Sequence, residues 1–160
     1  MFEKMLEQVY HMGFIVKDID ETMKNLVNLL GIKPWSLWTL KPPFLRDTTL
    51  HGKKVSHGFR FAIATIGNVS IELISPLEGE SVYVEHLKER GEGFHHIALG
   101  VPTEEQLEQV VEELKGQGGE VIQSGRLGDI ALYYYVDVKN AGLVLEIFTG
   151  HTPPPEKTYP

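Results

Sequence analysis

The sequence predicts an α+β fold built from two tandem βαβββ modules, because its two halves repeat each other in motif and in element order. Segment 11–16 (HMGFIV) aligns with 96–101 (HIALGV), and segment 69–75 (VSIELIS) aligns with 143–149 (LVLEIFT). In each half an apolar strand pattern precedes an amphipathic helix pattern, and three more strand patterns follow. A duplicated unit accounts for both observations.

The first half opens with a strand and a helix. Residues 8–16 are mostly β-branched, aromatic or apolar, which predicts the strand. Asp18 and Asp20 are candidate N-caps for an amphipathic helix over 22–30, and Gly31 is expected to end that helix.

Three further strands complete this half. A strand is predicted over 35–40, and Gly67 with Asn68 forms a two-residue turn signal between apolar runs, which indicates a β-hairpin of 59–66 and 69–75. The prolines and charges of 41–54 indicate an irregular loop. Residues 76–79 are expected to break the sheet before a short helix over 82–90.

The second half repeats the order. Thr103-Glu-Glu-Gln is a capping box that predicts the start of a helix, whose apolar stripe runs from Leu107 to Leu114 and which should end near 116–119. The strands predicted around this helix are 94–101, 120–123, 130–138 and 143–149.

Length and composition favour a single domain over residues 1–160, since 42% of the residues are hydrophobic. Its expected parts are a first module (8–79), a connecting helix (80–90), a second module (91–150) and a poorly ordered, proline-rich tail (151–160).

Charge and cysteine content exclude several classes of protein. A formal net charge of −7 makes nucleic acid and anionic membrane surfaces improbable partners. No apolar run is long enough to span a bilayer, and residues 1–8 are too charged and too short for a signal peptide. The absence of cysteine excludes disulfides and thiolate sites and fits a cytoplasmic location.

The repeat carries one asymmetry in length. Eleven more residues separate His11 from Glu72 than separate His96 from Glu146. The loop at 41–56 is the obvious place for these extra residues, and a long loop beside a site often acts as a lid or a substrate wall.

The histidine of each half lies in the first strand of its module. Because side chains alternate along a strand, His11 shares its face with Gly13, and His96 shares its face with Ala98. The same alternation puts His95 on the opposite face and excludes it from the set. Each small neighbour is expected to leave room for a cavity.

The glutamate of each half lies in the last strand of its module. Glu72 and Glu146 both have apolar neighbours on either side, which implies burial, and an unpaired buried carboxylate is costly. A divalent cation removes that cost. The sequence therefore predicts a metal site formed by His11, Glu72, His96 and Glu146, with positions left open for substrate oxygens.

From about residue 8 to residue 150 the chain resembles the vicinal oxygen chelate superfamily, which includes glyoxalases, bleomycin-resistance proteins and dioxygenases. The similarity is greatest to methylmalonyl-CoA epimerase, through ISPL-type residues after Glu72 and the segment 91–98 (GEGFHHIA). It implies paired modules curved into a half-barrel around a cobalt, nickel, zinc, manganese or iron ion. Glyoxalase I (lactoylglutathione lyase) resembles this chain in the same His, Glu, His, Glu order.

The resemblance also implies the chemistry. In both enzymes a metal holds a carbonyl or enediolate oxygen while a carboxylate moves a proton at the adjacent carbon. We expect Glu146 to be that base as well as a ligand. Epimerases of this type resemble one another in a second glutamate base, but Ser56 stands at the corresponding position here, with His57 or a loop residue as a possible substitute.

The resemblance further implies a small-molecule substrate, either a CoA thioester or a glutathione adduct, and a homodimer. Two alternatives remain open. An extradiol-type dioxygenase would use iron held by two histidines and one carboxylate, and Glu72 counts against it. A non-catalytic small-molecule binding protein would lack the metal set.

Overall fold

The computed structural model describes residues 9–160, so the predicted start of the first module at residue 8 and the charged N-terminal segment 1–8 lie outside the described residues. The helices are α1 (Ile19–Leu30), α2 (Val82–Glu89) and α3 (Glu104–Gly116). The strands are β1 (Val9–Ile15), β2 (Trp35–Leu40), β3 (Leu45–Leu50), β4 (Lys53–Lys54), β5 (His57–Ile66), β6 (Val69–Gly79), β7 (Gly93–Gly100), β8 (Glu120–Leu127), β9 (Ala131–Val138), β10 (Leu143–Gly150) and β11 (Lys157–Tyr159).

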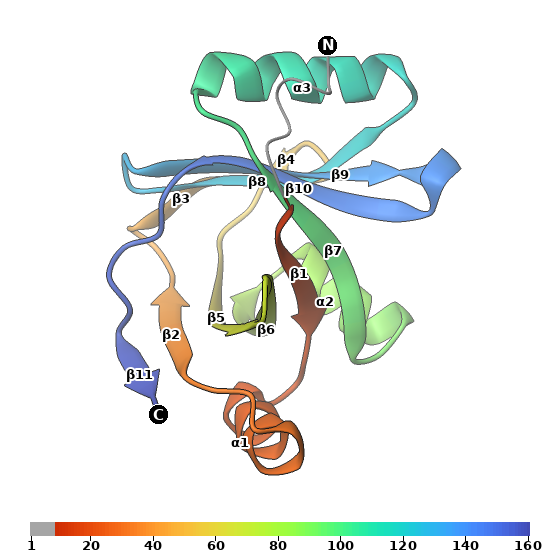
Figure 1. The fold of residues 1–160 in the computed structure, drawn as a ribbon. Coiled ribbons are helices and arrows are strands. Elements are labelled where there is room, and N and C mark those ends of the chain that lie inside the picture. The colour runs from red at the N-terminus through yellow and green to blue at the C-terminus, as the bar shows by residue number, and fades with distance from the viewer. Residues whose placement is uncertain (1–8) are drawn as a thin grey trace.

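The described strands form one sheet in the order β11-β2-β5-β6-β1-β7-β10-β9-β8-β3-β4, and the sheet curls strongly (Figure 1). Counted outward from its centre, the first half contributes β1, β6, β5 and β2, and the second half contributes β7, β10, β9 and β8. β1 pairs with β6 in parallel, as β7 does with β10, and β1 meets β7 antiparallel between the halves. The predicted α+β fold with two βαβββ modules in a half-barrel is confirmed.

The helices begin and end where the sequence signals lie. The Asp18 side chain accepts a hydrogen bond from the Glu21 N–H at 2.9 Å, and Gly31 ends α1 in the left-handed region at φ 67°. The Thr103 hydroxyl accepts from the Gln106 N–H at 3.2 Å at the start of α3. α1 and α3 lie on opposite outer sides of the curled sheet (Figure 1), so each module has its own covering helix.

Three apolar clusters stabilise this arrangement. α1 packs through Ile19 and Met23 against its own half of the sheet, and α3 packs through its predicted apolar stripe against the other half. The third cluster includes Tyr83 of α2 together with aromatic side chains of β5 and β9. This aromatic cluster lies beside the site described below.

The segment 41–56 is not the irregular loop that the sequence predicted. Residues 45–50 form β3, which pairs with β8 of the other half, and residues 53–54 form β4. Leu45 and Leu50 are buried there. Their strand forms by pairing with the second module, a partner that a local pattern cannot reveal.

Two further expectations are corrected at the strand ends. Residues 76–79 do not break the sheet, because β6 continues to Gly79 and pairs with β5 as far as His57. The segment 151–160 is not a poorly ordered tail, since β11 pairs antiparallel with β2 and the Trp38 Nε1–H donates to the Pro153 carbonyl at 2.7 Å. No helix among residues 9–160 has the length and apolar character needed to cross a membrane.

Candidate metal centre

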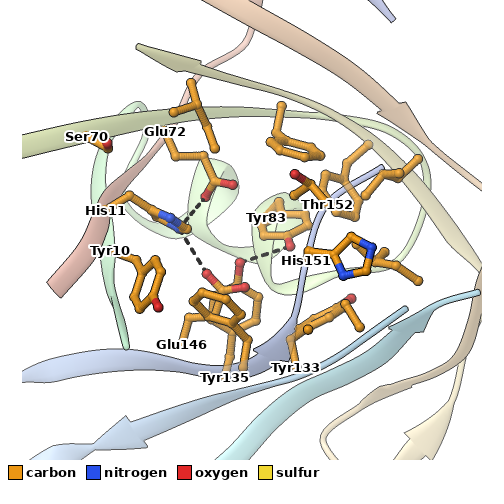
Figure 2. Close-up of a pocket in the computed structure, with 18 residues that line it drawn as sticks. Tyr10, His11, Ser70, Glu72, Tyr83, Tyr133, Tyr135, Glu146, His151 and Thr152 are labelled. Carbon is orange, nitrogen blue, oxygen red and sulfur yellow. Dashed lines mark hydrogen bonds and ion pairs between the residues drawn. The ribbon is translucent and has the colours of Figure 1, made fainter. Parts of the chain in front are cut away.

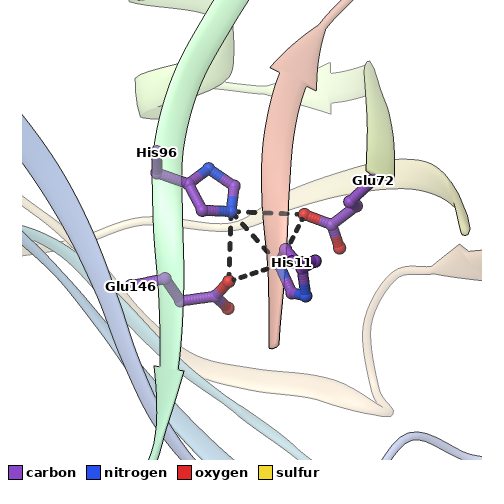
Figure 3. Close-up of side chains that lie close together, drawn as sticks. All are labelled: His11, Glu72, His96 and Glu146. Carbon is purple, nitrogen blue, oxygen red and sulfur yellow. Dashed lines mark hydrogen bonds and ion pairs between the residues drawn. The ribbon is translucent and has the colours of Figure 1, made fainter. Parts of the chain in front are cut away.

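Four side chains from the four central strands converge at one point (Figure 3). His11 comes from β1, Glu72 from β6, His96 from β7 and Glu146 from β10. One potential ligand atom of each residue lies within 4.8 Å of the corresponding atoms of the other three. The structure brings together all four residues that the repeat singled out.

The sheet register explains why they meet. In one row across the sheet, Gly13 lies between Glu72 and His96. In the next row, Ala98 lies between the other two members of the set. A Cβ atom on Gly13 would lie 1.9 Å from Cε1 of the His96 imidazole. The small residue therefore leaves room for a converging side chain rather than for the cavity itself.

The distances between the converging atoms suit a shared ion. Nε2 of His11 lies 3.2 Å from Oε2 of Glu72 and 3.1 Å from Oε2 of Glu146. Nε2 of His96 lies 3.3 and 3.2 Å from the same two oxygens and 3.3 Å from Nε2 of His11. Neighbouring donors that share an ion at about 2.0–2.2 Å are themselves roughly 3.0–3.4 Å apart.

The charges of the cluster also fit a cation. Oε2 of Glu72 is buried and, although it faces both imidazoles, makes no hydrogen bond of acceptable geometry. Such a carboxylate is costly unless a positive charge compensates it. Two imidazoles and two carboxylates would neutralise a divalent ion. These residues therefore have the donor set and the spacing that the expected metal requires.

Without a cation, protons hold the cluster together. Burial by itself lowers the pKa of His11, but the Glu72 and Glu146 carboxylates outweigh burial and raise that pKa to about 10. Burial raises the pKa of the Glu146 carboxyl, but hydrogen bonds from His11 and His96 hold it well below its usual range. A cation must displace protons from these imidazoles, so the affinity of the cluster for a cation should fall as the pH falls.

A cavity of about 350 Å³ opens beside the cluster (Figure 2). His11, Glu72 and Glu146 line it, whereas His96 is 0% exposed. Most of the remaining wall is apolar or aromatic and includes Leu40, Phe59, Phe61, Tyr133, Tyr135 and Phe148. Among the described residues, no lysine or arginine lines this cavity. The carboxylates among the described lining residues all belong to the cluster.

The wall includes residues that sequence reasoning missed. Phe148 lies two positions after Glu146 on the same strand face, so strand alternation could have identified it. His151 and Thr152 also line the cavity, because the chain beyond β10 passes it on the way to β11. No local signal marks these two residues. The segment 41–56, expected as a lid or substrate wall, contributes no residue to the lining.

The alternation argument misplaced His95. The pairing of β1 with β7 shifts between Gly13 with His96 and Phe14 with Phe94, so His95 is the extra residue of a β-bulge. Its side chain is buried, and its Nδ1 lies 3.0 Å from Nδ1 of His96. Burial lowers the pKa of His95 to about 2. His95 is absent from the converging set, as predicted, but it contacts a member of that set.

Ser56, which stands at the position of the second epimerase base, and its possible substitute His57 do not line the cavity, whereas Glu72 does. Ser56 is exposed and absent from the lining. His57 is 1% exposed, has no hydrogen-bond partner at either ring nitrogen and is also absent from the lining. Arg60 of β5 is also absent from the lining and pairs with Asp20 at 2.6 Å.

Comparison with solved structures shows the same fold. The structure is similar to Streptomyces coelicolor methylmalonyl-CoA epimerase in complex with 2-nitronate-propionyl-CoA, at 21% identity and a TM-score of 0.63, covering 93% of this chain and 98% of that one. It is also similar to methylmalonyl-CoA epimerase from Mycobacterium tuberculosis, at 21% identity and a TM-score of 0.61, covering 92% of this chain and 91% of that one.

Sequence comparisons give a relative and a family. The uncharacterized protein YqjC of Bacillus subtilis (strain 168) is 31% identical over 94 residues, which are 59% of this chain. The match spans 57% of that relative's length. Residues 10–134 match the family described as the glyoxalase/bleomycin resistance protein/dioxygenase superfamily. That match extends from the first module into the second and includes three of the four converging side chains, so the chain belongs to this superfamily.

Proposed function

We propose that this protein is a divalent-metal-dependent isomerase or lyase that moves a proton at the carbon next to a metal-bound carbonyl. The observation that carries the proposal is the convergence of His11, Glu72, His96 and Glu146 at the wall of a largely apolar cavity. An isolated set of charged groups beside an apolar wall suits a substrate that binds the metal through oxygen and places its remaining atoms in the cavity.

The four residues have different roles in this proposal. His11, Glu72 and His96 would hold the ion, which when bound supplies Lewis-acid stabilisation of negative charge on the substrate oxygen. Glu146 would be both a ligand and the group that takes and returns the proton. Its side chain is 14% exposed, against 9% for Glu72, and it lines the cavity where a substrate carbon would lie.

The leading candidate activity is of the methylmalonyl-CoA epimerase type. The fold shared with two such epimerases, one with an acyl-CoA analogue, supports a thioester substrate. The size of the cavity supports the same view, because about 350 Å³ is at the small end for ligand sites and suits an acyl group. The charged thiol carrier would then remain outside the apolar wall.

A glyoxalase I activity is the second candidate, and one observation favours it. Among the described residues, Glu72 and Glu146 are the only carboxylates that line the cavity, and neither Ser56 nor His57 reaches it. A reaction that uses one metal-bound glutamate as its base needs no further carboxylate. Epimerisation by two separate bases would require Glu72 as well as Glu146 to act as a base.

Two alternative functions are less well supported. A dioxygenase of the two-histidine, one-carboxylate type leaves more of the metal's positions open than this cluster of four does. A non-catalytic binding protein gives no reason for Oε2 of Glu72 to be buried without a hydrogen-bond partner. Catechol cleavage by the iron-loaded protein would support the dioxygenase.

Metal content tests the first half of the proposal. The purified protein is dialysed and its metals are measured beside His11→Ala and Glu146→Gln. The matched controls are His86→Ala and the surface variant Glu112→Gln. We expect about one ion per chain in the wild type and the controls, and a loss in both site variants. Unchanged stoichiometry in the two site variants would refute the metal centre.

Activity assays test the second half. Deuterium exchange into methylmalonyl-CoA is compared with turnover of the hemithioacetal of methylglyoxal and glutathione, both with metal-loaded protein. Exchange that is lost in Glu146→Gln would support the epimerase type, and hemithioacetal turnover would support the glyoxalase type. If the loaded protein catalyses neither reaction, these two substrate assignments are wrong, even if the metal centre is present.

A further inference from the structure

The two first strands of the modules carry equivalent bulges, each directly before the predicted histidine ligand. In β1, Val9 pairs with Leu99 and His11 pairs with Ala98, so Tyr10 is the extra residue. In β7, His95 is the extra residue, as described above. A bulge lets two successive side chains lie toward the same side of a sheet. Both ligands are therefore accompanied by the residue that precedes them.

The two bulged side chains have different surroundings. Tyr10 is 42% exposed and lies at the cavity beside Phe148. His95 is 8% exposed and lies behind His96, away from the cavity lining. The rest of the site repeats closely between the two modules. The burial of a polar side chain at the bulge of the second module alone, that of His95, therefore requires a reason of its own.

The contact between the two imidazoles supplies that reason. Nε2 of His96 faces Oε2 of Glu72 and Oε2 of Glu146, so a cation held by the cluster takes the lone pair of Nε2. A neutral imidazole then carries its proton on Nδ1. The only hydrogen-bond partner of that nitrogen in the described residues is Nδ1 of His95, at 3.0 Å. His96 must donate, and His95 must accept.

We propose that His95 is a positioning residue for the metal centre. It accepts a hydrogen bond from Nδ1–H of His96, which fixes the ring orientation and the tautomer in which Nε2 of His96 is free to bind the ion. Its own proton then resides on Nε2. This inference rests on the proposed metal centre and adds an outer residue to it. Such partners of ligating histidines typically alter metal affinity by 10–100-fold.

The packing around His95 holds its ring in place. The rings of Tyr83, Tyr135 and His86 meet it edge-on, with centroid distances of 6.1, 5.4 and 5.1 Å. The hydroxyls of Tyr83 and Tyr135 lie 3.1 Å apart and hydrogen-bond to each other. No hydrogen bond between either hydroxyl and His95 is present. The acceptor nitrogen thus remains available to His96.

Two substitutions separate the hydrogen bond from packing. His95→Phe keeps a ring of similar shape but removes the acceptor, and His95→Gln restores an acceptor oxygen. His86→Phe is the matched control, because it changes a ring that packs against His95 but leaves the hydrogen bond between His95 and His96 intact. Near-UV circular dichroism of the metal-free proteins in EDTA checks that each variant is folded.

The readouts are Co²⁺ affinity, from competition with a chelator, and the visible absorption of bound Co²⁺. We expect His95→Phe to weaken binding by about 10–100-fold and to change the spectrum. His95→Gln should recover most of the affinity, and His86→Phe should match the wild type. Equal affinity and identical spectra for His95→Phe and wild type would overturn the inference while leaving the metal centre standing.

A measurement on the unaltered protein covers the case in which His95→Phe does not fold. Long-range ¹H–¹⁵N NMR of the Zn²⁺-loaded wild type reports which imidazole nitrogens carry protons. We expect His96 protonated at Nδ1 and His95 protonated at Nε2. A His95 proton on Nδ1 would contradict the proposed acceptor. If the wild type binds neither Co²⁺ nor Zn²⁺, the metal centre itself fails, which is a distinguishable result.

Discussion

His57 offers a quantitative test of which histidines take part in function. It is 1% exposed, lies against Phe59 and Tyr83 with ring centroids 5.8 and 6.1 Å away, and has no hydrogen-bond partner at either nitrogen. Burial lowers its pKa from 6.5 to about 4. We expect His57→Leu to remove a pH-dependent part of the stability without removing activity.

The sign and the size follow from the two pKa values. Between about pH 6.5 and pH 4 the unfolded chain binds a proton at His57 that the folded protein does not, so stability falls as the pH falls. Between pH 7.5 and pH 5 this linkage is worth about 2 kcal/mol. Above pH 6.5 the contribution is complete and constant. The unpartnered nitrogens suggest that Leu costs little at neutral pH.

The assay is urea unfolding of wild type and His57→Leu at pH 7.5 and at pH 5, with EDTA present so that metal binding does not add to either curve. The wild type should lose about 2 kcal/mol more than the variant between the two pH values. Equal losses would refute the assigned environment of His57. A large loss of activity in folded, metal-loaded His57→Leu would revive His57 as a second base.

Three further predictions concern the site and its surroundings. Gly13→Ala should weaken Co²⁺ binding at least about tenfold, because the added Cβ would clash with the His96 ring, whereas Gly116→Ala, which has open space, should not; equal affinities would contradict the packing argument. Deleting the residues after Gly150 should lower the free energy of unfolding, measured by urea denaturation, by about 1–3 kcal/mol, because it removes β11 and leaves the buried Trp38 indole unpaired; an unchanged free energy would show that the segment adds no stability. Removing metal with EDTA should lower the melting temperature, and adding Zn²⁺ should raise it in a concentration-dependent way, more at pH 8 than at pH 6, because protons compete for the imidazoles. A melting temperature that ignores both additions would argue against binding to the folded state.

The sequence alone was sufficient to identify the repeat and the four side chains that converge. His11 and His96 stand at matching positions of first strands, and Glu72 and Glu146 stand at matching positions of last strands, so duplication alone identified them. Caps at Asp18 and Thr103 are likewise local, because a side chain within three residues satisfies the helix N–H groups. Information of this kind lies within a short stretch of chain.

The tertiary structure decided what depends on a distant partner. The argument from alternating side chains holds only for an unbroken strand, and the bulge at His95 becomes visible only in the pairing of β7 with β1. β3 forms against β8 of the other half, and β11 forms against β2 across more than a hundred residues of chain. Strand pairing and burial are set by the neighbour as much as by the strand itself. For this reason the sequence by itself determined which four side chains form the candidate metal centre, and only the folded sheet determined that His95 supports one of them and that His151 and Thr152 help to enclose the cavity.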